Sequence, residues 1–245
     1  MFSIFNKKKS NVTDLNWLGV DIHSHLLPGI DDGAKDLAES ISYIKSLHSL
    51  GLNKLICTPH IFTGVYPNTS DTIFPVLENV KQTLRAEGVH IDVLAAAEYM
   101  VDDTFVVGSG HLCLENNYIL IEMSYLNETP NIEQVIFDLQ IKGYIIVLAH
   151  PERYNFYHND QKRYHRFKDM GCLLQLNLLS VTGYYGKNVE RQASYLLKNG
   201  LYDLAGTDLH NDKHLKALTF AVKNGTLFER IGQYPFMNLQ LFGSV

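Results

Sequence analysis

The sequence predicts an α/β protein, a distorted TIM-like (β/α)7 barrel in a single domain. Short apolar runs alternate along the chain with segments whose apolar residues recur at helical spacing. Such alternation is typical of parallel strands joined by helical crossovers. The series continues without a repeat, a low-complexity block or an obvious linker, which favours a closed or nearly closed barrel over an open sheet.

The expected elements follow one another in a regular order. Apolar runs predict seven strands, at residues 18–22, 55–57, 91–97, 118–121, 145–149, 173–176 and 202–205. Helical spacing predicts helices near 37–47, 74–84, 132–139 and 189–198, ended by Gly51, Gly88, Gly143 and Gly200. We expect residues 1–17, with lysines at 7–9, to be an N-terminal tail and residues 18–245 to be the barrel domain.

The composition excludes several classes of protein. Hydrophobic residues make up 46% and charged residues 19% of the 245 residues, so the chain can bury a sizeable core. A net charge of -5 argues against a general affinity for nucleic acid. No apolar run approaches the ~20 residues that cross a bilayer. The three cysteines are far apart and form no CxxC pair, which is typical of a reducing cytoplasm, where we expect the protein.

Ionisable residues follow nearly every expected strand. In chain order they are His23 and His25, His60, Glu98, Glu122, His150 with Arg153, and Asp208 with His210. A lone strand-end histidine is more often structural than a ligand, but parallel barrel strands all end on one face. So many imidazoles and carboxylates on one face indicate bound cations. The mixture favours Zn, Mn or Fe over Ca or Mg, and the lack of thiolates favours a catalytic site.

A family resemblance rests on these residues. The run Asp21-Ile-His-Ser-His-Leu-Leu-Pro-Gly-Ile-Asp-Asp-Gly33, with Thr58-Pro-His60, Glu98, Glu122, His150-Pro-Glu-Arg153 and Asp208-Leu-His210, resembles bacterial protein-tyrosine phosphatases of the polymerase-and-histidinol-phosphatase (PHP) type. The resemblance covers residues 18–212. It implies an enzyme of capsule or exopolysaccharide export that acts on a phosphotyrosine protein, above all a bacterial tyrosine kinase, and that could form a homo-oligomer.

The resemblance also implies three divalent ions, manganese in the first place, with iron, zinc or cobalt as alternatives. His23, His25, Glu98 and Asp208 would hold one ion, Glu98, Glu122 and His150 a second, and Asp32, His60 and His210 the third. Asp32 and its neighbour Asp31 suit a turn and helix start equally well. Arg153 would face the phosphate. The family's second phosphate-binding arginine is missing, and Lys213 or Lys216 stands in that segment.

The expected reaction is attack of metal-bound hydroxide on phosphorus, with Arg153 clamping phosphoryl oxygens and Asp208 or a histidine moving a proton. This reaction needs no cysteine nucleophile. Cys57 lies inside an expected strand and outside the CxxxxxR loop that is typical of thiol-dependent phosphatases. Aromatic residues expected at the rim are Phe62, Tyr66, Tyr125, Tyr184 and Tyr185.

Three other functions are compatible with these residues. One is a small-molecule phosphatase, such as a histidinol-phosphate phosphatase of the same superfamily. A second is a metal-dependent amidase, although such enzymes normally use a bridging strand lysine where this chain has Glu98. The third is a non-catalytic, metal-stabilised binding module. Turnover of a phosphotyrosyl peptide, histidinol phosphate or para-nitrophenyl phosphate separates them.

Overall fold

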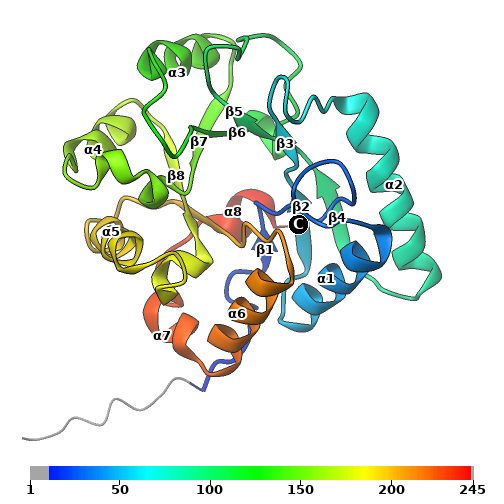
Figure 1. Cartoon of the computed structure of the whole chain (residues 1–245). Helices are drawn as coiled ribbons and strands as arrows, with labels where there is room; N and C mark the ends of the chain where they lie inside the picture. Colours follow the sequence, from blue (N-terminus) through cyan, green and yellow to red (C-terminus); the bar gives the residue numbers. More distant parts are fainter. Residues whose placement is uncertain (1–10, 244–245) are drawn as a thin grey trace, which may run out of the picture.

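The computed structural model describes residues 11–243 and has a mixed α/β fold with parallel sheets (Figure 1). Strands β1 (Val20–Asp21), β2 (Lys54–Cys57) and β4 (Asp92–Ala95) form one sheet, in the order β1-β2-β4. The second sheet has the order β3-β5-β6-β7-β8-β9, with bounds His60–Ile61, Glu98–Met100, Tyr118–Glu122, Ile145–Ala149, Leu173–Asn177 and Leu204–Gly206. All pairings between these strands are parallel.

The two sheets are joined where β2 leads into β3 and β4 leads into β5. At these bends the Ala96 N–H donates to the Cys57 carbonyl (2.8 Å) and the Glu98 N–H donates to the Pro59 carbonyl (3.1 Å). The strand predicted at 91–97 is therefore shorter, ending at Ala95 as β4, and a separate strand, β5, begins at Glu98 in the other sheet. The bend between them brings Glu98 to the start of β5, where it pairs in register with His60.

The first and last strands also meet. Just beyond β1 and β9, Ser24 forms a parallel bridge with Leu209, and the Asp208 N–H donates to the His23 carbonyl (2.8 Å). At the other end of these strands, the Asn238 amide donates to the carbonyls of Val20 (2.9 Å) and Ala205 (2.7 Å). Segments nearly 200 residues apart in the chain therefore lie side by side.

Residues 11–243 contain eight α-helices, of which α1 to α7 surround the strands, whereas α8 lies in the middle of the view in Figure 1. Their bounds are Leu37–Ser49 (α1), Ser70–Ala86 (α2), Ile132–Ile141 (α3), Lys162–Asp169 (α4), Lys187–Lys198 (α5), Asp212–Lys223 (α6), Thr226–Ile231 (α7) and Asn238–Phe242 (α8). In α1 the Asp36 side chain caps the start, and Ile41, Ile44 and Leu47 bury one face. None of the described helices has the length and apolar character needed to cross a membrane.

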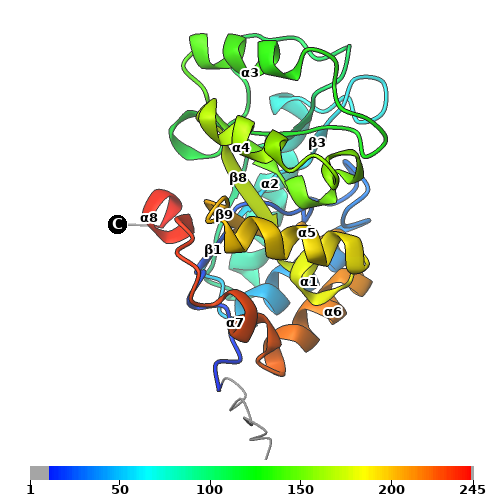
Figure 2. The ribbon, with the colours of Figure 1, turned by 90° about the vertical axis from the view of Figure 1, so that its left-hand side faces the viewer.

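The core has two parts. Most buried apolar residues lie between the helices and the outward faces of the strands. A smaller cluster gathers residues in or just after several strands together with Leu114 and with Phe242 of α8. The strand residues and those just after strands are Val20, Ile22, Ile56, Ala96, Leu120, Val147, Ala149 and Leu204. Figure 2 shows α8 set apart from the other helices, beside β1 and β9.

Residues 11–17 correct the prediction of a tail up to residue 17. Leu15 is fully buried, and its N–H donates to the Leu50 carbonyl (2.6 Å). The Trp17 ring packs against Phe228 and Phe236, with centroids 6.0 and 6.4 Å apart. Two large apolar side chains within seven residues are enough to attach this segment to the domain. The lysines at 7–9 lie outside the described residues.

Candidate active site

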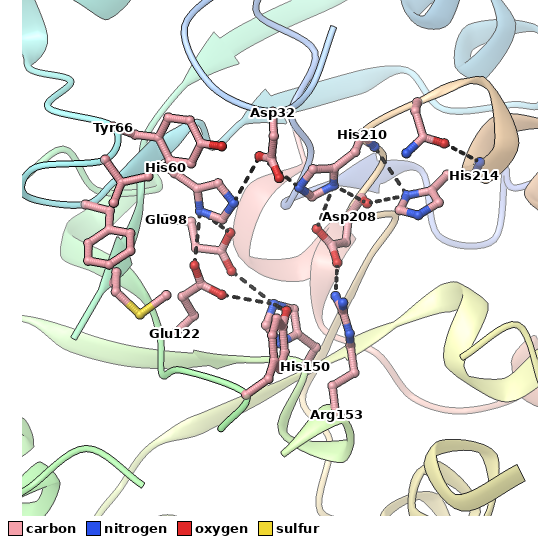
Figure 3. A pocket seen from close by; sticks show the side chains of 15 residues that line it. Asp32, His60, Tyr66, Glu98, Glu122, His150, Arg153, Asp208, His210 and His214 are labelled. Carbon is pink, nitrogen blue, oxygen red and sulfur yellow. Dashed lines mark hydrogen bonds and ion pairs between the residues drawn. The ribbon is translucent and has the colours of Figure 1, made fainter. Parts of the chain in front are cut away.

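The structure brings the nine predicted ligands together at the carboxyl ends of the strands. Seven of them line a cavity of about 390 Å³, namely Asp32, His60, Glu98, Glu122, His150, Asp208 and His210. His23 and His25 lie beneath them and are fully buried. Figure 3 shows how the labelled side chains point toward one another. Glu98, His150 and Asp208 face the same cavity, as the predicted metal site requires.

Two of these ligands, His150 and Asp208, have an unusual backbone conformation that directs their side chains. His150 directly follows β7 and has φ 31°, and Asp208 follows β9 and has φ 49°. Side-chain-bearing residues adopt this left-handed region at a cost of about 1–3 kcal/mol, and such strain is typical of functional sites. His23 and His25 need no special backbone geometry, because residues two apart on an extended strand share a face.

The atoms of the first predicted ligand group are spaced as donors to one ion. His23 Nε2 and His25 Nε2 are 3.3 Å apart and lie 3.1 and 3.2 Å from Glu98 Oε2. Asp208 Oδ1 lies 3.4 and 3.5 Å from the same two nitrogens. Four donors arranged tetrahedrally at about 2.1 Å from an ion are about 3.4 Å apart. This group therefore fits a divalent metal.

Glu98 provides a further test of the fit. Its Oε2 atom is buried and lies 3.1–3.2 Å from nitrogens of His23, His25 and His60. This oxygen nevertheless has no hydrogen-bond partner. A carboxylate oxygen among imidazole nitrogens that do not donate to it suits a shared cation better than a hydrogen-bonded network.

The other two predicted groups also lie close together, with His60 between them. Asp32 Oδ1 is 3.5 Å from His60 Nε2 and 3.6 Å from His210 Nε2. His150 Nε2 is 3.0 Å from Glu98 Oε1 but 3.9 Å from Glu122 Oε2. The other His60 nitrogen, Nδ1, is 3.0 Å from Glu122 Oε1. His60 can therefore contribute to either group through its two nitrogens.

Side chains outside the nine predicted ligands orient the histidines. Asp31, the neighbour of Asp32 in the segment that suits a turn and helix start, accepts from His25 Nδ1 at 2.8 Å and also from the His60 N–H (3.1 Å). Gln175 Oε1 lies 2.8 Å from His23 Nδ1. Each contact leaves the opposite ring nitrogen directed at the ligand group, as is usual for metal-binding histidines. Only the fold reveals Gln175 as a partner, since it is 152 residues from His23.

Arg153 lies beside this cluster. Its Nη1 atom is 2.6 Å from Asp208 Oδ2, which also accepts from the Asn177 amide at 2.7 Å. The guanidinium carbon is 4.5 Å from the centroid of the Tyr125 ring and 4.4 Å from that of Tyr185. Stacking on aromatic rings fixes the plane of an arginine and leaves its remaining N–H groups to bind an anion.

The predicted lysine contact to phosphate has no counterpart in the pocket wall. Lys213 is exposed and does not line the cavity, and Lys216 pairs with Asp212 within α6. Asn211 and His214 line the cavity in this region. Lys213 and Lys216 are both exposed.

The electrostatics of the site are dominated by burial and by opposed charges. Burial alone would lower the pKa of His23, but Glu98 and Asp208 outweigh it and raise that pKa to about 9. Burial would raise the pKa of Asp31, but His25 lowers it to about 2. Burial raises the pKa of Cys57 to about 12, so this thiol is protonated at neutral pH and is no nucleophile.

The predicted rim aromatics divide into three kinds. Phe62, Tyr66 and Tyr125 line the cavity. Tyr185 stacks on Arg153 without lining the cavity wall. Tyr184 packs edge-on against His214, with ring centroids 5.3 Å apart, and also lies outside the lining.

Known proteins resemble this chain over most of its length. It is 32% identical over 198 residues to the tyrosine-protein phosphatase YwqE of Bacillus subtilis, covering 79% of this chain and 78% of that protein. It is 27% identical over 230 residues to the putative tyrosine-protein phosphatase CapC of Staphylococcus aureus, covering 85% and 90% of the two chains.

Solved structures also resemble this chain over most of its length. A structure from work on YwqE of Bacillus subtilis and CpsB of Streptococcus pneumoniae, described as metal-dependent tyrosine phosphatases, matches with a TM-score of 0.79 and 29% identity, covering 92% of this chain and 95% of that one. A lactonase from Listeria monocytogenes shares only the fold, with a TM-score of 0.55 and 12% identity over 94% and 92% of the chains. The family model for capsular polysaccharide synthesis proteins CpsB/CapC matches residues 19–222, ten residues beyond the resemblance seen in the sequence. The chain therefore belongs to the CpsB/CapC family.

Proposed function

We propose that this chain is a metal-dependent protein-tyrosine phosphatase that hydrolyses the phosphate monoester of phosphotyrosine in proteins. The observation that carries the proposal is the spacing of His23, His25, Glu98 and Asp208 donor atoms beside an arginine stacked between two aromatic rings. Relatives that share this chain's family are tyrosine-protein phosphatases, and the matching structure is of metal-dependent ones.

We assign three divalent ions, with manganese as the first candidate, to the three ligand groups. The four carboxylates, of Asp32, Glu98, Glu122 and Asp208, would leave an excess of about two positive charges on the loaded site, which attracts a phosphate dianion. Bound divalent ions supply a nucleophile at neutral pH by lowering the pKa of water, and they neutralise phosphoryl oxygens.

The protein groups bind and orient the substrate. Arg153 donates to the phosphoryl oxygens from a plane fixed by Tyr125 and Tyr185. Burial would raise the pKa of Asp208, but His210, His23 and Arg153 hold it well below its usual range. Asp208 accepts a hydrogen bond from Arg153 and is placed to hold a metal and to orient the arginine. A phenolate, with an ordinary pKa of about 10, leaves with little protonation.

We also assign the fold to the PHP type, with the strands forming one closed, distorted barrel and residues 18–245, together with the attached segment 11–17, forming one domain. The bridge between Ser24 and Leu209 supports closure on one side. The links from β2 to β3 and from β4 to β5 support it on the other side. The natural substrate that we propose is a bacterial tyrosine kinase, and we propose that the enzyme acts as a homo-oligomer.

The test combines metal removal with a choice of substrates. The purified chain is stripped with a chelator, and each metal is added back before phosphate release is measured from a phosphotyrosyl peptide and from histidinol phosphate. We expect activity on the peptide to vanish on stripping and to return with manganese, while a thiol-blocking reagent has no effect. Preference for histidinol phosphate would favour the small-molecule phosphatase, and no turnover of either substrate or of para-nitrophenyl phosphate would favour a binding module.

A further inference from the structure

One wall of the active-site cavity is apolar. It is formed by Phe62, Val65, Tyr66 and Met100. None of the four belongs to either hydrophobic core cluster, and the Val65 side chain is 54% exposed. Apolar side chains that are not needed for the core, and that border a polar site, are typical of a ligand-binding surface.

Strand register places this wall next to the ligand groups. Phe62 comes two residues after His60, along the direction of β3, and Met100 comes two residues after Glu98 on β5. Residues two apart on a strand point to the same face. Since β3 and β5 pair with His60 opposite Glu98, continuing the register by one step places Phe62 beside Met100. The apolar layer therefore lies directly above the layer of His60 and Glu98.

The turn that carries Phe62, Val65 and Tyr66 is held by hydrogen bonds. The N–H of Phe62 donates to the carbonyl of Tyr66 at 2.9 Å, and the return bond is 2.8 Å. Gly64 permits the tight turn with φ 81°. The Asn68 amide donates to the carbonyls of His60 (2.9 Å) and Ile30 (2.8 Å). A surface fixed in this way loses little conformational entropy when it binds a ligand.

We propose that Phe62, Val65, Tyr66 and Met100 form the subsite for the aromatic ring of phosphotyrosine. The proposal rests on the proposed function and identifies the groups that distinguish aryl from alkyl phosphates. Figure 3 shows Tyr66 and Arg153 on opposite sides of the ligand cluster, so the ring and the phosphoryl group have separate binding surfaces. A phosphoserine has no ring with which to cover the apolar wall.

The experiment measures ring binding without hydrolysis. The full-length, manganese-loaded chain is titrated calorimetrically with phenylphosphonate and with methylphosphonate, which share the phosphonate group and differ in the ring. We expect phenylphosphonate to bind roughly tenfold more tightly, a difference of about 1.4 kcal/mol. In Val65→Ser and in Phe62→Ala this ratio should fall severalfold. Val106→Ser is the matched control, because Val106 is 76% exposed and does not line the cavity.

The outcomes separate the subsite from the proposed function. Equal binding of the two phosphonates by the native chain, or an unchanged ratio in both wall variants, overturns the subsite. If Phe62→Ala loses its circular dichroism signal or its metal, the exposed Val65→Ser variant decides. A native chain that prefers phenylphosphonate but releases no phosphate from a phosphotyrosyl peptide overturns the proposed phosphatase and retains an aryl-binding site.

Discussion

At the scale of single residues, Arg153 has two contacts that must be distinguished. It pairs with Asp208, and in our proposal it also binds the phosphoryl group. Asp208 Oδ2 keeps a second partner in Asn177, so the aspartate does not depend on the arginine alone.

For Arg153→Ala we expect kcat/KM on a phosphotyrosyl peptide to fall roughly 10- to 100-fold, the usual effect of losing a hydrogen bond to a charged group. Bound metal, measured by elemental analysis, should be unchanged. Arg153→Lys should recover only part of the activity, because an ammonium lacks the planar fork. Loss of metal from the alanine variant would show that Arg153 mainly supports the structure.

Asp31 offers a test of how the histidines are oriented. Asp31→Asn keeps the shape of the side chain but weakens acceptance from His25 Nδ1 and from the backbone of His60. We expect the affinity for manganese, measured by competition with a fluorescent chelator, to fall roughly 10- to 100-fold. Asp103→Asn is the control, since Asp103 is exposed and does not line the active-site cavity. Equal affinities in the two variants would contradict the orienting role.

At the scale of elements, the first turn of α3 is tied to α4 by Glu133. Its carboxylate lies 2.7 Å from Arg166 Nη2 and 2.6 Å from Arg163 Nη1. Hydrogen bonds from Arg166 and Arg163 lower the pKa of Glu133 from 4.5 to about 2. A carboxyl whose pKa is lowered by folding stabilises the fold above its unfolded pKa and loses that effect as pH falls.

Glu133→Gln should therefore lower the free energy of unfolding at pH 7 by up to about 1 kcal/mol, a modest effect because the carboxylate is partly exposed. The difference from the native chain should shrink below about pH 4.5 and be nearly gone near pH 2. Urea midpoints at pH 7 and pH 3, both in chelator, measure it. Glu229→Gln, at an exposed position in α7, should show no such dependence on pH.

An element could be predicted from the sequence only where burial gives it a clear pattern of apolar residues. Strands that are buried on both faces appear as apolar runs, so β7 and the residues after it could be located. Helix α4 could not, because among its eight residues only Tyr164 and Phe167 are buried. The break between β4 and β5 was hidden because two alanines continue the apolar run. Ligands at strand ends were predictable, whereas Gln175 acts through a contact that exists only after folding.

At the scale of the whole molecule, ligand groups from most of the strands share one site. Ions bound there would connect β1, β3, β5, β6, β7 and the segment after β9. A ligand that binds only the folded state stabilises it by about 2.7 kcal/mol at a concentration 100 times its Kd.

Removal of metal should therefore lower the midpoint of thermal unfolding by roughly 5–10 °C, given about 2–4 °C per kcal/mol for a chain of this size. Differential scanning calorimetry with manganese, with chelator and with manganese restored measures the shift. His150→Ala should show a smaller response to the chelator. A midpoint indifferent to metal would contradict the idea that the ions connect the strands.

The meeting of β1 with β9 has a consequence for biosynthesis. His23 and His25 leave the ribosome early, whereas Asp208 and His210, which complete their ligand groups, are translated nearly 190 residues later. The growing polypeptide thus carries reactive imidazoles long before their partners exist. The ligand groups that contain Asp208 or His210 can bind an ion only when translation is almost finished, and a product terminated before residue 208 would lack them.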